Sequence, residues 1–319
     1  MKRGIDTPLP GMVKEIMRLD FQAYRKAWDQ ADEIRPASPL NLDIELSSSC
    51  NLRCPNCIQS KGFKGAFMPR AMAGRLIDEA DAMGISALKF NWRGESTLHR
   101  EFSEIVSYAH GKGFVDLLLN TNGQCPDAAM RGMLLCTKVS ISLDTMDPRK
   151  YQWLRRGGVL KKAKDTISRL LAGGHTNVCV RRIVGKENQE EPFIDHVRAE
   201  WGQAVKVAEH FVFTRTESCL TPLREGDPKS WPRRYCGQPN RRLVVGSNGE
   251  MAPCCVDYGC QLIPAFRYPT ESLATAWKAI AEIGKGSLPD TCKHCVSYSA
   301  YDVPERELLK DQDGKKACL

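Results

Sequence analysis

Three cysteines lie within eight residues in the segment SSSCNLRCPNCIQS, which runs from Ser47 to Ser60. They are Cys50, Cys54 and Cys57, with the spacing C-x3-C-x2-C. A disulfide uses two sulfurs, and a structural zinc site uses four ligands, of which a nearby fourth is missing here. A cluster with four irons has four corners, so three thiolates from one loop leave one iron open to another ligand. The spacing therefore favours a 4Fe–4S cluster with one open iron.

A second set of cysteines lies in the last third of the chain: Cys236, Cys254, Cys255, Cys260, Cys292, Cys295 and Cys318. The chain has 14 cysteines in all. Its first twenty residues contain no apolar run long enough for a signal peptide, and no stretch approaches the length of a transmembrane helix. We therefore expect a cytoplasmic protein without membrane contact, in which metal ligation is a better explanation for clustered cysteines than disulfides.

The charge of the chain is basic. Its 319 residues are 42% hydrophobic and 26% charged, with a formal net charge of +8. Positive residues concentrate in the segment DPRKYQWLRRGGVLKKAKDTISR at 147–169 and recur as the pairs 181–182, 233–234 and 241–242. Such residues are either a solvated surface or the complement of an anionic partner, for example a cofactor carboxylate, a phosphorylated substrate or a nucleic acid.

Six strand patterns alternate with helical patterns between residues 41 and 210, after an N-terminal helical segment at 1–40. The predicted strands are 42–46, 87–92, 115–120, 138–143, 177–184 and 204–209, with helices around 71–83 and from about 101 onward between them. This alternation predicts parallel strands with crossover helices. Six units indicate an α/β fold of the partial (β/α)6 barrel type rather than a closed eight-stranded barrel, and the cysteine loop follows its first strand.

The alternation stops near residue 210, and we place a domain boundary at 210–235. The segment RRLVVGSNGEMAPCC predicts a β-hairpin with its turn at Asn248-Gly249. A helix around 272–283 and the segment DTCKHC follow. The predicted domains are therefore an N-terminal helical extension (1–40), the partial barrel (41–210) and a small α+β domain at 211–319.

On these motifs the chain resembles the radical S-adenosylmethionine (SAM) superfamily, over about residues 40–300. In that family SAM chelates the open iron of the cluster, and the reduced cluster donates one electron to cleave it. The resulting 5′-deoxyadenosyl radical removes a hydrogen atom from the substrate. The segment WRGESTLH ends the second predicted strand, where the family usually has Gly-Gly-Glu, and Arg93 replaces the first glycine.

The resemblance also implies which residues bind SAM. Glu95 accepts a hydrogen bond from the SAM ammonium, and either Arg181 or Arg182 meets the SAM carboxylate, because alternation turns one of them into the barrel. Asn56 stands where many members have an aromatic residue or histidine, so its contact to adenine is expected through the backbone. The implied SAM-binding residues are Asn56, Gly94, Glu95, Asn120, Asn122, Ser142, Asp144, Arg181 and Arg182.

The spacing C-x12-G-x4-C, from Cys236 through Gly249 to Cys254, resembles the opening of SPASM and twitch domains. That resemblance implies a second, auxiliary 4Fe–4S cluster held by Cys236, Cys254, Cys292 and Cys295. No cysteines follow at the later SPASM positions, so the shorter twitch domain fits better. A four-cysteine zinc ribbon from the same residues is the alternative. The roles of Cys255, Cys260 and Cys318 stay open, although Cys255 is expected to point away from Cys254 on a strand. The cysteines at 125, 136, 179 and 219 are expected to be buried apolar residues.

A fully ligated auxiliary cluster can accept an electron but cannot bind substrate. We therefore expect a two-electron oxidation, as in the twitch-domain dehydrogenases that the chain resembles, with a flavodoxin or ferredoxin as electron donor. A radical isomerase or epimerase and a nucleotide- or nucleic-acid-modifying enzyme are alternatives, and so is a non-enzymatic zinc-bound scaffold or nucleic-acid-binding module. The forty residues before the barrel are too few for a leader-peptide-binding domain, which favours a polar small-molecule substrate.

Overall fold

The fold is known from a computed structural model that describes residues 18–31, 33–55, 57, 59, 65–211, 236–283, 289 and 292. Eight strands form one sheet: β1 (Asn41–Ile44), β2 (Ala87–Lys89), β3 (Asp116–Thr121), β4 (Lys138–Ser142), β5 (Val178–Val184), β6 (Val205–Phe211), β7 (Arg242–Val245) and β8 (Met251–Ala252). Their order is β6-β5-β4-β3-β2-β1-β7-β8. All neighbours pair in parallel except β7 and β8, so the predicted strand–helix alternation is confirmed as a parallel α/β sheet.

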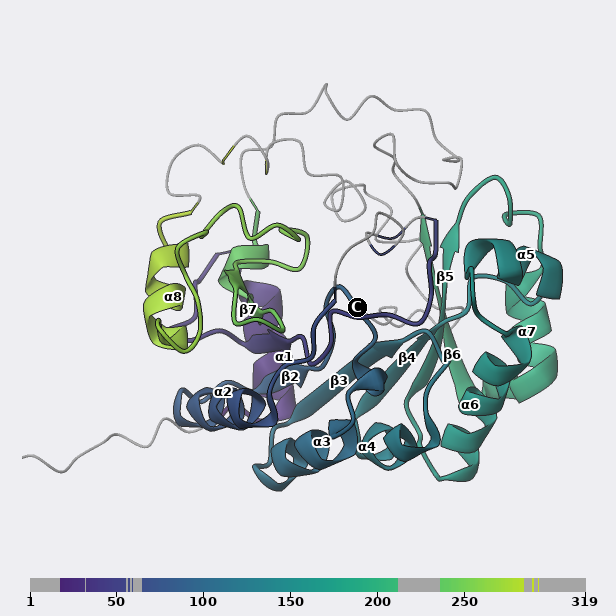
Figure 1. The fold of residues 1–319 in the computed structure, drawn as a ribbon, viewed down its shortest axis with the longest axis horizontal. Helices are drawn as coiled ribbons and strands as arrows, with labels where there is room; N and C mark the ends of the chain where they lie inside the picture. The colour runs from purple at the N-terminus through teal and green to yellow at the C-terminus, as the bar shows by residue number, and fades with distance from the viewer. Residues whose placement is uncertain are drawn as a thin grey trace, which may run out of the picture.

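The helices in the described part of the chain are α1 (Phe21–Gln30), α2 (Arg70–Ala82), α3 (Phe102–Gly111), α4 (Met130–Leu135), α5 (Pro148–Leu154), α6 (Leu160–Ala172), α7 (Phe193–Trp201) and α8 (Leu273–Ile280). Figure 1 shows α2, α3, α4, α6 and α7 along one side of the curved sheet. Short 3-10 turns η2 (Ser96–Leu98), η3 (Asp127–Ala129), η4 (Gly202–Ala204) and η6 (Gln238–Asn240) complete the elements. None of the described helices is long and apolar enough to cross a membrane.

Alternation along the strands separates two faces of the sheet. Apolar residues such as Leu42, Leu119 and Val180 pack in the main hydrophobic core with the helices. Every second position points the other way, because successive side chains of a strand alternate between faces. This other face, which we call the inner face, carries Asp43, Lys89, Asn120, Ser140, Ser142, Arg181, Ala208 and His210. A mostly polar inner face is suited to a polar ligand rather than to a second core.

The predicted hairpin is confirmed, with one correction. Gly249 has φ +84° in the turn between β7 and β8, where a Cβ would lie 2.1 Å from the Tyr268 carbonyl oxygen. β7 pairs in parallel with β1, so the hairpin extends the same sheet rather than standing apart from it. The expectation that Cys255 lies on a strand was wrong, because β8 ends at Ala252 and Cys254–Cys255 follow in a turn.

The N-terminal helix packs near the amino ends of the first strands. Tyr24 and Ala31 form a small apolar cluster with Leu40 and Ala87. Asp20 caps the helix by accepting a hydrogen bond from the Ala23 amide at 2.8 Å. The first 17 residues of the predicted N-terminal helical segment lie outside the described residues.

Candidate active site at the carboxyl ends of the strands

The cysteine loop begins where β1 ends and is fixed by the loop after β2. The Glu95 amide donates a hydrogen bond to the Ser49 carbonyl at 2.8 Å. A Cβ on Gly94 would lie 2.4 Å from the Ser47 carbonyl oxygen, so no larger residue fits there without moving the backbone. Gly94 therefore acts through close packing of two backbones.

The three loop thiols lie within electrostatic reach of one another. Burial raises the pKa of Cys50 to about 11, and the neighbouring thiols at Cys54 and Cys57 add to the rise. Burial also raises the pKa of Cys54. The Cys57 amide donates to the Cys54 carbonyl at 3.0 Å, which folds this end of the loop into a turn. No three His, Cys, Asp or Glu side chains in the described ranges are arranged closely enough to hold a metal ion.

Hydrogen-bond donors surround the loop sulfurs. Cys50 Sγ accepts from the Leu52 amide at 3.4 Å and from Asn122 Nδ2 at 3.6 Å. Cys54 Sγ lies 4.0 Å from Arg155 Nη1. Arg155 Nε is buried and has no hydrogen-bond partner among the described residues. Donors aimed at the sulfurs, and a buried cation with a spare donor beside them, fit an anionic thiolate-ligated cluster.

Glu95 connects this loop to the turn after β3. Its side chain is buried, and Oε1 accepts from the hydroxyl groups of Thr97 at 2.7 Å and Thr121 at 2.8 Å. Oε2 accepts from the Asn122 amide at 2.8 Å. Burial raises the pKa of this carboxyl although four donors act against the rise. The carboxylate thus holds Asn122 in position, and Oε2 keeps a lone pair for a further donor.

Asp144 and Arg155 form an ion pair, of which the sequence predicted only Asp144 as a site residue. Asp144 Oδ2 lies 2.7 Å from Arg155 Nη2, and Oδ1 accepts from the Ile183 amide at 2.9 Å. Asp144 has φ +67°, a strained conformation that non-glycine residues rarely adopt and that often marks functional sites. The sequence left open whether the basic segment is a solvated surface or the complement of an anionic partner, and for Arg155 a solvated surface does not hold, because 13% of its side chain is exposed. Its position between Asp144 and Cys54 depends on tertiary packing, and the basic run gave no signal of it.

The two arginines of β5 point to opposite faces. Arg182 packs toward α7, where it pairs with Glu209 at 2.6 Å and lies over the Phe193 ring. Arg181 is on the inner face, and its Nε and Nη2 donate to His210 Nε2 at 3.1 and 2.5 Å. Burial and the charge of Arg181 lower the pKa of His210 to about 4, so the ring is a neutral acceptor. Arg181 is therefore the arginine available to a ligand.

The remaining predicted SAM-binding residues occupy the same edge. Ser142 is the register partner of Arg181, and Asn120 is the partner of Ser140. The side chains of Ser142 and Asn120 are half-buried on the inner face. Asn122 Nδ2 donates to Asn51 Oδ1 at 2.8 Å, which ties the third-strand turn to the cysteine loop. Asn56 lies outside the described residues.

Arg93 is buried at the end of the second strand pattern and joins the sheet to the C-terminal hairpin. Its guanidinium binds Glu45 through Nε–Oε1 at 3.0 Å and Nη2–Oε2 at 2.6 Å, and it also pairs with Glu250. The neighbouring Trp92 donates from Nε1 to the Cys255 carbonyl at 2.8 Å and stacks on Tyr258. The residue that replaces the family glycine is thus an ionic link to the second cysteine region.

The C-terminal cysteines are brought together in part. Burial raises the pKa of Cys254, and the nearby thiols of Cys255 and Cys236 add to the rise. Cys260 packs in a small apolar cluster with Val244 and Ala252. Cys292 is half-buried, whereas Cys295, Cys318 and Cys219 lie outside the described residues. The expected burial of the cysteines at 125, 136 and 179 is confirmed.

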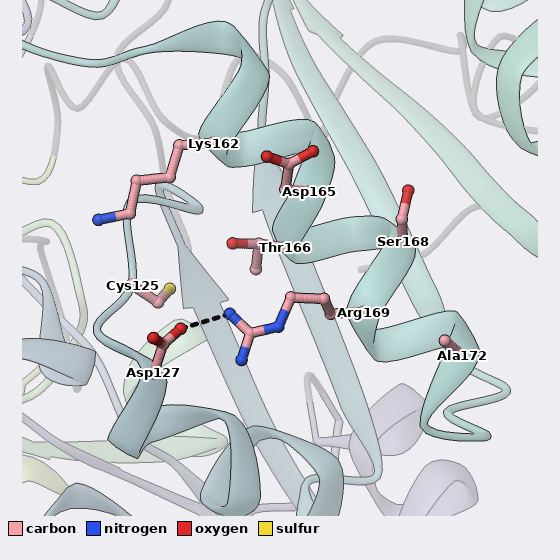
Figure 2. A pocket seen from close by; sticks show the side chains of 8 residues that line it. All are labelled: Cys125, Asp127, Lys162, Asp165, Thr166, Ser168, Arg169 and Ala172. Atoms are coloured by element: carbon pink, nitrogen blue, oxygen red, sulfur yellow. Dashed lines mark hydrogen bonds and ion pairs between the residues drawn. The ribbon is translucent and has the colours of Figure 1, made fainter.

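A surface pocket of about 560 Å³ lies elsewhere, on the helix side of the sheet between η3 and α6. Figure 2 shows the Asp127–Arg169 ion pair across it and Lys162 at one end. The pocket meets the turn after β3 through Cys125, whose Sγ lies 3.2 Å from Thr121 Oγ1, and through Thr166, whose Oγ1 donates to the Gly123 carbonyl at 2.9 Å. This pocket does not contain the cysteine loop, so we do not assign the chemistry to it.

Comparison with known proteins places this geometry in context. Residues 44–199 match the family model described as the Radical SAM superfamily. A probable GTP 3′,8-cyclase of Archaeoglobus fulgidus is 30% identical over 159 residues, which are 47% of this chain and 51% of that protein. The mycofactocin maturase MftC of Mycobacterium ulcerans is 29% identical over 158 residues, 47% of this chain and 42% of that protein. The chain spans about half the length of the curated relatives it matches.

Among solved structures, Streptococcus suis SuiB bound to S-adenosylmethionine has a TM-score of 0.62 at 14% identity. The match covers 80% of this chain and 69% of SuiB. At that identity the match shows that this chain and SuiB share a fold, which is built on a mostly parallel sheet.

Proposed function

We propose that the chain, whose residues 44–199 match the model of the Radical SAM superfamily, is an enzyme that cleaves S-adenosylmethionine reductively and removes a hydrogen atom from a polar substrate. The observation that carries the proposal is the loop of Cys50, Cys54 and Cys57 at the carboxyl end of β1, with donors directed at two of its sulfurs. The expected setting is the cytoplasm, where thiols stay reduced.

The residues have distinct tasks in this proposal. Cys50, Cys54 and Cys57 hold a 4Fe–4S cluster, which together with SAM supplies hydrogen-atom abstraction when bound. Asn122 and Arg155 orient the loop and donate to its sulfurs. Glu95 keeps a carboxylate lone pair for the SAM ammonium, as the superfamily resemblance implies.

The other SAM contacts are assigned by position on the strands. Arg181 is the candidate for the SAM carboxylate, because it is the β5 arginine on the inner face. Asp144, Ser142, Asn120 and the backbone at Gly94 lie at the same edge of the sheet and complete the set. Asn56 stays a candidate through its place between Cys54 and Cys57.

We further propose an auxiliary 4Fe–4S cluster in a twitch- or SPASM-like region at 211–319, held by Cys236, Cys254, Cys292 and Cys295. The Cys236 thiol adds to the raised pKa of Cys254, which supports the first half of this ligand set. A cluster with four protein ligands can accept an electron but has no open iron for a substrate. The proposed reaction is therefore a two-electron oxidation of the substrate. A zinc ribbon made by the same cysteines is the competing arrangement.

A nucleotide substrate is the second candidate, since several relatives are named GTP 3′,8-cyclase. An isomerase or epimerase would use the same SAM chemistry without net oxidation. The mostly polar inner face suits either kind of substrate.

The test is anaerobic incubation of the reconstituted enzyme with SAM, dithionite and candidate deuterated substrates. The proposal expects 5′-deoxyadenosine and methionine in equal amounts, deuterium in 5′-deoxyadenosine, and a product two hydrogens lighter by mass spectrometry. A product of unchanged mass would assign an isomerase, and absence of 5′-deoxyadenosine would overturn the proposed function.

A further inference from the structure

The basic segment between α5 and α6 lies directly against the cysteine loop. The Arg53 amide donates to the Arg156 carbonyl at 2.8 Å. A Cβ on Gly157 would be 3.5 Å from the Asn51 carbonyl oxygen, and one on Gly158 would be 3.3 Å from Leu52 Cδ2. These contacts mean that the α5–α6 connection packs on the backbone that carries Cys50 and Cys54.

This segment carries exposed positive side chains, of which Lys162 also lines the pocket between η3 and α6. Residues 147–165 contain seven lysines and arginines and two carboxylates. Arg149, Arg156 and Lys162 are exposed and make no side-chain ion pair among the described residues. Trp153 and Val159 are 40% and 58% exposed beside them, which adds apolar area to the charge. We call these five residues the basic rim.

We propose that the basic rim is the docking surface for an acidic one-electron donor protein of the flavodoxin or ferredoxin class. This inference rests on the proposed function, because it needs a cluster at Cys50, Cys54 and Cys57 that accepts an electron. In each encounter the donor is oxidised by one electron and the cluster is reduced by one electron, with no bond made. Opposite charge would steer the donor to the part of the surface that packs on the cysteine loop.

The position of the rim favours a donor over a nucleic acid. α5 and α6 lie outside the sheet, whereas a substrate base would have to reach the polar inner face. The basic rim has one exposed tryptophan, Trp153, without the row of aromatic residues that stacks single-stranded bases. Electron-transfer encounters use small interfaces, and tryptophan is common where binding energy concentrates.

The experiment compares two charge-reversal variants of the full-length holoenzyme. R149E/R156E/K162E changes the rim, and K26E/R131E/K278E makes the same charge change at exposed positions on α1, α4 and α8. Flavodoxin affinity is measured by biolayer interferometry at about 50 and about 300 mM salt, which brackets the screening range. Production of 5′-deoxyadenosine is measured in parallel with reduced flavodoxin and with dithionite.

The rim variant should lose at least about tenfold in flavodoxin affinity at low salt and in the flavodoxin-driven rate. Its dithionite-driven rate should equal that of the wild type, and the α1/α4/α8 variant should resemble the wild type in every assay. Equal losses in both variants, or an unchanged flavodoxin affinity, would overturn the proposal. A rim variant that loses RNA or DNA binding and keeps flavodoxin affinity would also overturn it and assign the rim to a nucleic acid. If the wild type makes no 5′-deoxyadenosine with dithionite, the proposed function fails, while the affinity measurement still decides the docking surface.

Discussion

Replacing Arg93 by methionine should destabilise the protein strongly, because it leaves two carboxylates without their shared cation. The Arg93 side chain is 5% exposed, and its partners Glu45 and Glu250 are 0% and 14% exposed. Glu45 receives two guanidinium hydrogen bonds at 3.0 and 2.6 Å. Burial alone would raise the pKa of Glu250, but the hydrogen bond and charge of Arg93 bring it below its ordinary value.

Removal of one partner of a buried ion pair costs about 3–5 kcal/mol. Methionine keeps much of the arginine stem, so little of the loss comes from a cavity. For a chain of 319 residues, with an unfolding entropy of about 2.1 cal/mol/K per residue, each kcal/mol lowers the melting temperature by about 1.5 °C. We therefore expect the Arg93→Met variant to melt about 4–8 °C below the wild type.

Thermal unfolding followed by far-ultraviolet circular dichroism under anaerobic conditions measures this change. The matched control is Arg70→Met, whose partner Glu101 lies at 3.1 Å in a pair with 60% and 44% exposed side chains. That exposed pair contributes less than about 1 kcal/mol. The reasoning is refuted if the two variants melt within about 2 °C of each other, since Arg93 would then be no more important than a surface arginine.

Three further predictions follow from the site. Burial, and then the charge of Arg181, lower the pKa of His210 from 6.5 to about 4, so as the pH falls the unfolded state binds the His210 proton before the folded state does. The free energy of unfolding should therefore decrease between about pH 6.5 and about pH 4. Urea titrations of His210→Gln should lack this part of the pH dependence, and an equal slope in wild type and variant would contradict the prediction. Gly94→Ala should distort the cysteine loop and lower the melting temperature. The control Gly74→Ala adds a Cβ on α2 that meets nothing within 4 Å, so it should be neutral or stabilising. Equal melting temperatures of the two variants would exclude close packing of Gly94 against the cysteine loop. Replacement of all three loop cysteines by alanine should leave about four of about eight irons after reconstitution, and stoichiometric zinc in their place would assign a zinc ribbon.

The elements of the fold could be predicted because their patterns are local. The apolar residues at 87–92 and 177–184 and the alternation at 138–143 mark strands, and the structure ends each within three residues of the predicted bounds. The pairing of β7 with β1 could not be predicted, since nothing in the RRLVV segment says which sheet edge it meets. Long-range pairing of this kind is decided by tertiary packing.

The candidate site was predictable where spacing carries the signal. Cys50, Cys54 and Cys57 are recognised from their distances along the chain. Arg155 was missed because its partners Asp144 and Cys54 are brought near only by folding. Arg93 appeared in the sequence as a departure from a glycine motif, and its partners Glu45 and Glu250 are distant in the chain.

The central claim is that the loop thiols hold the cluster that cleaves SAM, and a single-cysteine variant tests it most directly. Cys54→Ala is compared with Cys136→Ala, a buried cysteine at the end of α4 whose thiol donates to the Gly132 carbonyl at 3.6 Å. Both proteins are reconstituted anaerobically and incubated with SAM and dithionite, and 5′-deoxyadenosine is measured by chromatography and mass spectrometry. The account predicts that Cys136→Ala forms 5′-deoxyadenosine like the wild type and that Cys54→Ala forms none. Wild-type amounts of 5′-deoxyadenosine from Cys54→Ala would contradict the account.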